Sequence, residues 1–155
     1  MQSKKIIFDE YFKILSKTFE DVIPFNKLIK MQLENMNGDI GVKIDMRKEL
    51  IGNYTKKMLH GGVISSVMDV AGGLTALTGM IKKETEIPLD VICERYFKLA
   101  TINLRVDYLR PGEGPSFLAT GSVLRAGKLV CLVDIKLHNN LKQLIAVGIG
   151  TYKVA

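Results

Sequence analysis

One carboxylate lies in the middle of an otherwise apolar segment. Residues 58–73 read MLHGGVISSVMDVAGG, which has helical length and no proline, and Asp69 stands near the end of that run. A carboxylate on a buried helix is costly unless another group pairs with it or the protein uses it. Asp69 could hydrogen-bond across a contact between two helices, or it could serve as a general base. The helix alone leaves both interpretations open.

The helix face around Asp69 carries little bulk. Ser65 and Ser66 lie one turn before the carboxylate, and Gly72 and Gly73 lie one turn after it. Two adjacent glycines inside a helix are destabilising by about 1 kcal/mol each relative to alanine. The compensation that we expect is close approach of another backbone or of a ligand to this face.

The start of the same helix offers hydrogen-bond donors. His60, Gly61 and Gly62 stand where the helix predicted over residues 62–80 begins. N–H groups in the first turn of a helix have no partner within it, so they can bind an oxyanion or polarise a carbonyl group. His60 itself could contact a ligand, or it could only cap the helix start.

These two features cannot meet on one helix. Asp69 follows Gly61 by eight residues, which corresponds to about 12 Å along the helix axis. Two antiparallel helices related by a twofold axis could bring the amide of one to the carboxylate of the other. The spacing therefore predicts a site shared between two subunits, present twice in a symmetric dimer.

The hydrophobic pattern predicts an α+β fold. Apolar residues recur at helical spacing over residues 5–29, where Pro24 ends or kinks the helix. They alternate with polar residues over residues 38–46, which predicts a strand. Residues 47–59 are predicted to be a loop that contains a turn at Gly52 and Asn53.

Four further strands are predicted after the central helix. Short turns separate them, which favours an antiparallel meander, and the long apolar helix before them favours a sheet that wraps around it. Their ranges are residues 100–112, 116–128, 129–137 and 143–154. Residues 30–33 and 91–98 match neither the helical nor the strand period.

Length and composition describe an ordinary globular domain. The chain has 155 residues, of which 47% are apolar and 25% are charged, enough for one domain with a real core. No apolar run approaches the roughly 18 residues needed to span a bilayer, and the N-terminus lacks the features of a signal peptide. We therefore expect a cytoplasmic protein.

Charge and cysteine content narrow the class further. The net charge is +6, but basic residues are scattered and tryptophan is absent, so we expect no nucleic-acid partner. A small phosphorylated ligand fits the positive excess equally well. Cys93 and Cys131 are far apart in sequence, without a CxxC motif or a Cys/His cluster. We therefore expect neither a metal site nor a disulfide framework.

The segment around Asp69 resembles a known family. GNYTKKMLHGGVISSVMDVAGG is similar to the Asn…HGG…Asp signature of hotdog-fold acyl-CoA thioesterases of the phenylacetate-degradation (PaaI-like) type. RKELIGN before the helix and INLRVDYLRP after it look closest to the YigI-like branch. The resemblance extends over roughly residues 38–153, and the combined motifs are far more specific than HGG alone.

The resemblance implies an architecture. Family members have the hotdog fold, in which a curved antiparallel sheet wraps around a long central α-helix. Their subunits join sheets as homodimers, which often pair into homotetramers. On this basis, residues 1–30 are an N-terminal helical extension and residues 31–155 are the hotdog thioesterase domain.

The resemblance also implies catalytic roles. Gly61 would supply the N–H that polarises the thioester carbonyl, and Asn53 would assist it. Asp69 from the partner subunit would act as general base on water or as nucleophile. Thr101 stands where relatives place a hydroxyl residue that orients the water. No cofactor is implied, because coenzyme A is part of the substrate. Thr101 and Asn53 also have purely structural interpretations, in a strand and in a turn.

Substrate contacts follow from the same resemblance. Arg110, Arg125 and Lys128 are candidates for contacts with coenzyme A phosphates, and Gly127 would allow close backbone approach. These residues are otherwise ordinary solvated turn residues. A medium or long acyl chain would enter the dimer interface beside the central helix, with the N-terminal helix over one end. The residues predicted to line the substrate site there are Gly62, Ser65, Ser66, Gly72 and Gly73.

Two other functions fit the same fold. A non-catalytic acyl-CoA-binding module would need no buried carboxylate beside the thioester, which favours the enzyme. A hotdog dehydratase or hydratase would need a catalytic histidine, for which His60 is the serious candidate because His138 lies in a predicted turn. The sequence leaves open the acyl group, the choice between coenzyme A and acyl carrier protein, and dimer versus tetramer.

Overall fold

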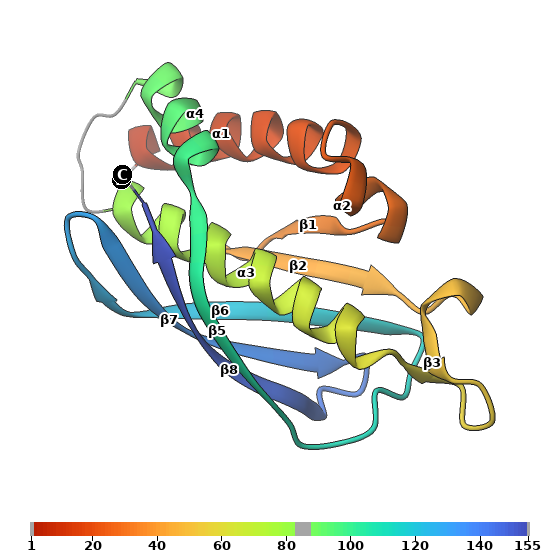
Figure 1. Cartoon of the computed structure of the whole chain (residues 1–155). Coiled ribbons are helices and arrows are strands. Elements are labelled where there is room, and N and C mark those ends of the chain that lie inside the picture. Colours follow the sequence, from red (N-terminus) through yellow and green to blue (C-terminus); the bar gives the residue numbers. More distant parts are fainter. Residues whose placement is uncertain (1, 83–87, 155) are drawn as a thin grey trace.

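The computed structural model describes residues 2–82 and 88–154. A curved sheet folds around one long helix, α3 (Figure 1). In chain order the elements are α1 (Gln2–Asp21), α2 (Pro24–Ile29), β1 (Gln32–Asn35), β2 (Ile40–Asp45), the 3₁₀ helix η1 (Lys48–Leu50), β3 (Ile51–Asn53), β4 (Met58–Leu59), α3 (Gly61–Ile81), α4 (Leu89–Lys98), β5 (Ala100–Tyr108), β6 (Ser116–Ala126), β7 (Val130–Asn139) and β8 (Leu144–Lys153).

The main sheet has the strand order β1-β2-β6-β7-β8-β5, and all neighbours run antiparallel. β6, β7 and β8 are consecutive in the chain and adjacent in the sheet, which confirms the predicted meander for these strands. β5 departs from it, because it lies at the sheet edge beside β8 and not beside β6. The connection over residues 109–115 holds two prolines and two glycines and is a crossing instead of a hairpin turn.

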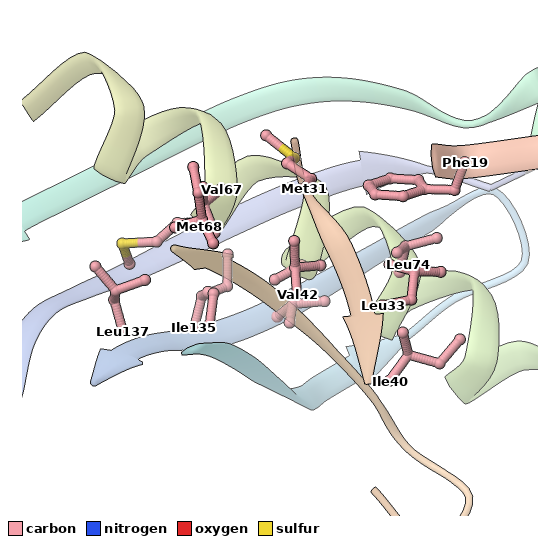
Figure 2. Close-up of a cluster of buried hydrophobic side chains, with 14 of the residues drawn as sticks. Phe19, Met31, Leu33, Ile40, Val42, Val67, Met68, Leu74, Ile135 and Leu137 are labelled. Carbon is pink, nitrogen blue, oxygen red and sulfur yellow. The ribbon is translucent and has the colours of Figure 1, made fainter. Parts of the chain in front are cut away.

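α3 is the central helix of the hydrophobic core. Val67, Met68 and Leu74 are at most 1% exposed, and they gather with Ile135 and Leu137 of β7 in one cluster (Figure 2). The helix contacts β2, β5, β6, β7 and β8. Burial of these apolar side chains is the main favourable contribution to folding. The predicted α+β arrangement, with a curved sheet around a long helix, is confirmed.

α3 is apolar enough to compare with a membrane-spanning helix. By length and apolar composition it reaches what a bilayer span requires. Asp69 still interrupts the apolar run, as the sequence indicated, but one acidic residue among apolar and small residues leaves the mean hydropathy of the helix high. Most of the helix is buried inside the protein, so its apolar character serves the core of this fold.

α1 and α2 form the N-terminal extension. Tyr11, Leu15 and Phe19 recur at four-residue intervals on one face of α1 and are at most 4% exposed. α1 ends before Pro24, as predicted. Pro24 then begins α2, where the N–H that proline lacks would have no acceptor within the helix. Lys30, with φ 54°, ends α2 in the left-handed conformation.

Short elements appear where the sequence showed no clear pattern. The loop predicted over residues 47–59 contains η1 and a hairpin of β3 and β4, and the prediction of an unstructured loop was incomplete. The His60 N–H donates to the Leu50 carbonyl at 2.9 Å and ties this hairpin together. Strands of two or three residues are too short to show alternation. Residues 91–98 belong to α4, and residues 30–33 lead into β1.

Candidate functional site

His60 caps the start of α3. Its backbone is extended, with φ −63° and ψ 134°, and its Nδ1 accepts a hydrogen bond from the Gly62 N–H at 2.8 Å. His60 therefore caps the helix, as one of its two interpretations predicted, and the Gly62 N–H of the first turn is already hydrogen-bonded within the chain. The side chain is exposed, so the cap lies at the protein surface.

Gly61 keeps its backbone donor. Among the described residues, no side chain or carbonyl accepts a hydrogen bond from the Gly61 N–H. The Gly61 carbonyl accepts from Tyr108 Oη at 3.1 Å, which holds the first peptide of the helix in place. A Cβ at this position would lie 3.5 Å from the Tyr108 ring, an ordinary contact. The position therefore supplies a fixed N–H group, and it would tolerate a small side chain.

Asn53 is engaged in the hairpin between β3 and β4. Its Oδ1 accepts hydrogen bonds from Thr55 Oγ1 at 2.7 Å and from Lys56 N–H at 3.1 Å. This is the turn-holding interpretation of Asn53. Within one chain its side chain has no hydrogen bond to Gly61, so its assistance to the oxyanion donor remains a prediction.

Ser65 and Ser66 are bonded to their own helix. Both hydroxyls donate to the Gly62 carbonyl, at 3.0 Å and 2.7 Å. Such bonds to the preceding turn satisfy the hydroxyls locally. Neither side chain lines the pocket that contains Asp69. Both hydroxyls therefore lie against their own helix, and their contact with a substrate remains a prediction.

Asp69 and Thr101 are brought together by the fold. Asp69 is half-buried, and its Oδ1 accepts a hydrogen bond from Thr101 Oγ1 at 2.8 Å. Thr101 lies at the start of β5, directly opposite Tyr152 on β8. The sequence placed Thr101 beside Asp69 only through family resemblance, and the structure supplies the contact. A carboxylate held by one hydroxyl keeps its other oxygen for a second partner.

Tyr152 is the aromatic neighbour of this pair. It is 1% exposed, and no hydrogen bond of good geometry reaches its Oη from the described residues. Burial and then the Asp69 carboxylate raise the pKa of Tyr152 well above its ordinary value. The hydroxyl therefore remains protonated around neutral pH and can donate a hydrogen bond.

A pocket of about 330 Å³ opens beside Asp69, Thr101 and Tyr152. Most of its wall is apolar and comes from the N-terminal helices, the middle of α3 and the end of α4. This cavity lies within one chain, whereas the sequence predicted an acyl site in the dimer interface. α1 supplies one wall of this pocket through Phe19. The apolar lining residues include Phe19, Ile23, Val70, Leu74, Phe97 and Leu99.

The two glycines after Asp69 have different neighbours. A Cβ on Gly72 would collide with the Tyr152 hydroxyl and with Ile135, so the predicted close approach is made here by side chains of β8 and β7. Gly73 lines the pocket, and a Cβ there would lie 3.1 Å from Leu99. Only Gly73 therefore faces space that a ligand can occupy in one chain.

The basic residues predicted to bind phosphate lie apart. Arg110 donates to the Leu144 carbonyl at 2.9 Å, at the start of β8. Arg125 and Lys128 line a pocket of about 480 Å³ at the β6–β7 hairpin, beside the end of β8. The length of β8 separates these places by roughly 30 Å. One chain therefore does not bring Arg110 to the other two residues, although Gly127 does lie with them.

Sequence reasoning missed Tyr152 and the individual residues of the pocket wall. Gly72 and Gly150 were the available signal, because both leave room for the Tyr152 ring; a Cβ on Gly150 would lie 2.5 Å from it. That signal becomes readable only when β8 is placed against α3. The wall from α1 could not be found by spacing, because Phe19 lies 50 positions before Asp69 in the chain.

Comparison with known proteins identifies the family. The model of the thioesterase superfamily matches residues 56–146, which contain Gly61, Asp69 and Thr101. The medium/long-chain acyl-CoA thioesterase YigI of Escherichia coli K12 is 37% identical over 147 residues, covering 94% of this chain and 95% of YigI. The similarity to the YigI-like branch is thereby confirmed.

Solved structures agree with the fold. A protein of Shewanella oneidensis related to the thioesterase superfamily superposes with a TM-score of 0.89 at 41% identity, covering 96% of this chain and 98% of that one. The E. coli PaaI protein from the phenylacetic acid degradation operon has a TM-score of 0.71 at 18% identity, covering 95% and 94%. The chain therefore belongs to the thioesterase superfamily, and it is a thioester hydrolase on the hotdog fold.

Proposed function

We propose that this protein is an acyl-CoA thioesterase that hydrolyses medium-chain or long-chain acyl-CoA to the free acid and coenzyme A. The observation that carries the proposal is the Asp69–Thr101 hydrogen bond at an apolar pocket. A carboxylate there can act on a thioester carbonyl while the pocket holds the acyl chain. The similarity to YigI over 94% of the chain supports this substrate class. A cytoplasmic location and a role in lipid metabolism go with the proposal.

The proposed reaction needs one donor and one carboxylate. The Gly61 N–H binds the carbonyl oxygen and stabilises the negative charge that develops on it. Asp69 removes a proton from water, or attacks the carbonyl carbon directly, with Thr101 holding one carboxylate oxygen. On the general-base route, the tetrahedral intermediate releases the coenzyme A thiolate, which takes up a proton, and the acyl group leaves as the acid. On the nucleophilic route, loss of the thiolate leaves a mixed anhydride on Asp69, which water then hydrolyses to the acid and the free carboxylate.

We propose that a dimer completes the site. β5 pairs with β8 on one side only among the described strands, and its Ile102 and Tyr108 are 59% and 53% exposed. An open edge strand with exposed apolar residues is a template for another strand. Tyr108 contacts Gly61 at one end of β5, and Thr101 contacts Asp69 at the other.

A twofold axis through two such edges gives the required geometry. Identical strands related by that axis pair antiparallel, so the Tyr108 end of one β5 lies beside the Thr101 end of the other. Gly61 of one subunit then approaches Asp69 of the partner subunit. The same pairing would bring Arg110 toward the basic hairpin at residues 125–128 of the partner, where coenzyme A phosphates could bind. Two dimers could pair further into a tetramer.

The acyl chain would occupy the pocket beside Asp69. Phe19 and Ile23 from the N-terminal extension close it on one side, and Leu74 of α3 lies on another. Burying apolar acyl surface against these side chains supplies binding free energy in proportion to chain length. The extension would therefore set the preference for acyl chain length.

Two alternatives are less consistent with the geometry. A dehydratase would need a free catalytic histidine, but His60 Nδ1 is used as the helix cap. A pure acyl-CoA-binding module would bind substrate without releasing thiol. It has no use for the half-buried Asp69 carboxylate that Thr101 positions.

The test is thiol release from a panel of acyl-CoA substrates of increasing chain length. Asp69→Asn keeps the size of the side chain and the hydrogen bond from Thr101, yet removes the base, so kcat should fall by roughly a hundredfold or more. Asp45→Asn, an exposed aspartate on β2, is the matched control and should keep the wild-type rate. Binding without thiol release by the wild type would favour the binding module instead.

A further inference from the structure

Tyr152 carries a buried hydroxyl that has no role in the reaction proposed above. The side chain is 1% exposed, and its Oη has no well-formed hydrogen bond among the described residues. A buried hydroxyl without a partner is destabilising, and most such groups in proteins are paired. This side chain also lines the pocket that contains Asp69. The acceptor that the pocket offers to this donor is the Asp69 carboxylate.

The surrounding sequence makes room for this hydroxyl. A Cβ on Gly72 of α3 would collide with Tyr152 Oη, and a Cβ on Gly150 of β8 would collide with the ring and Oη. Glycine within a helix or a strand is unfavourable unless something packs closely against it. α3 and β8 therefore each hold a glycine, unfavourable in a helix or a strand, at the position that leaves room for the Tyr152 side chain. A phenylalanine would fill nearly the same volume, so the hydroxyl is the feature to explain.

The hydroxyl is placed beside a single anionic group. Thr101 and Tyr152 are register partners on β5 and β8, and Thr101 donates to Asp69 Oδ1 at 2.8 Å. Asp69 and Tyr152 are the ionisable side chains among the described pocket residues; the lining from α1, α2, α4 and β5 is uncharged. Burial and Asp69 raise the pKa of Tyr152, so its hydroxyl stays protonated and acts as a donor.

We propose that Tyr152 is a second positioning residue for Asp69, whose hydroxyl donates to the carboxylate during thioester hydrolysis. Thr101 and Tyr152 then hold Asp69 from two adjacent strands. One carboxylate lone pair is kept directed at the reacting water or carbonyl carbon. Tyr152 acts through Asp69 and does not touch the thioester. The inference rests on the proposed function, because it assigns a role within the same site.

The experiment compares Tyr152→Phe with wild type and with Tyr11→Phe. Tyr11 is also a buried tyrosine, but it lies in α1 outside the pocket and is the matched control. Thiol release from a medium-chain acyl-CoA gives kcat, KM and their pH profiles, and thermal unfolding gives Tm. Loss of a hydrogen bond to a charged group should lower kcat of Tyr152→Phe by roughly tenfold or more. KM should stay at the wild-type value, and Tm should not fall, because the hydroxyl that is removed is buried without a well-formed hydrogen bond.

The pH profile gives a readout that a purely structural role would not move. Tyr152 donates to the ionised form of the carboxylate, so its removal should shift the acid limb of kcat/KM to higher pH. Tyr11→Phe should match wild type in rate and pH profile. An unchanged kcat and pH profile in Tyr152→Phe, or a change in KM alone, would overturn this inference while the thioesterase function stands. A wild type that releases no thiol would overturn both.

Discussion

The start and the middle of α3 each supply one part of the proposed site, and they are built in opposite ways. At the start, the proposed functional group is a backbone N–H, fixed by the His60 cap and by Tyr108. In the middle, it is the Asp69 side chain, to which Thr101 of β5 donates a hydrogen bond. The pocket around Asp69 is lined by residues from both ends of the chain, Phe19 and Tyr152. The first arrangement is local, whereas the second exists only after the sheet closes around the helix.

This difference has a consequence for mutation. A backbone donor is independent of the side chain that it carries, so most substitutions at Gly61 should leave it intact. Proline alone removes the N–H. The carboxylate arrangement depends on distant side chains, so changes far from Asp69 in sequence should alter it. The following experiments test this contrast, from the largest expected effect to the smallest.

Gly61→Pro should have the largest effect. Proline is favoured at the first position of a helix, and the extended His60 backbone, with ψ 134°, suits a following proline. The variant should therefore fold, yet lose the oxyanion donor. We expect kcat to fall by roughly a hundredfold to a thousandfold. Steady-state thiol release measures the rate, and circular dichroism checks helix content and Tm.

Gly61→Ala is the matched control for that variant. It keeps the N–H, and its Cβ would make only ordinary contact with Tyr108 at 3.5 Å. Its kcat should stay within a few-fold of wild type. Equal losses in the alanine and proline variants would mean that space at Gly61 matters and its N–H does not.

A mixture of two inactive variants tests the shared site. Gly61→Pro and Asp69→Asn subunits should each be inactive alone. Random pairing makes half of the dimers mixed, and each mixed dimer has one intact site of two, so about a quarter of wild-type activity should return. Refolding the variants together and measuring thiol release gives the result. Recovery at background level would place both groups of each site in the same subunit.

Ile23→Trp tests the contribution of the N-terminal extension. Ile23 lines the pocket, and a larger side chain there should shorten the space for the acyl chain. We expect kcat/KM for the longest chains to fall roughly tenfold relative to short chains. Phe25→Trp, at a 49% exposed position outside the pocket, is the control. An unchanged chain-length profile would place the acyl chain elsewhere.

Thr101→Val should have the smallest effect of the series. Valine keeps the shape of threonine but removes the donor to Asp69 Oδ1. Because this hydrogen bond is exposed to solvent, unlike the buried Tyr152 hydroxyl, kcat should fall only about fivefold, corresponding to about 1 kcal/mol. Thr101→Ser keeps the donor and should retain most of the activity. If serine and valine reduce kcat equally, the methyl group of Thr101 matters and its hydroxyl does not.

Local features of the chain could be predicted from sequence. Helical spacing of apolar residues predicted α1 and α3, and Pro24 predicted the break after α1. Alternation of apolar and polar residues predicted β2, and the short turns predicted the meander. The separation of Gly61 from Asp69 follows from helix geometry, whereas the cap was one of two interpretations left open for His60. What could not be predicted depends on tertiary packing. The edge position of β5 comes from its crossing connection, and the wall at Phe19 comes from docking of the extension.

The same limit applies to several of the predicted site residues. Asn53 and the serines could bond either to a ligand or to their own backbone, and short-range spacing does not distinguish these outcomes. The structure shows the bonds to nearby groups. Arg110 and Arg125 are fifteen positions apart, which gives no sign that they lie at opposite ends of β8.

The position of the N-terminal extension has an evolutionary consequence. α1 contributes a wall of the pocket, yet the family model matches only residues 56–146, which begin after that helix. Phe19 and Ile23, which form part of the proposed acyl wall, therefore lie in a different part of the chain from the residues proposed for catalysis. Drift or recombination in the first thirty codons could change which fatty acyl groups are accepted while the reaction itself is inherited unchanged.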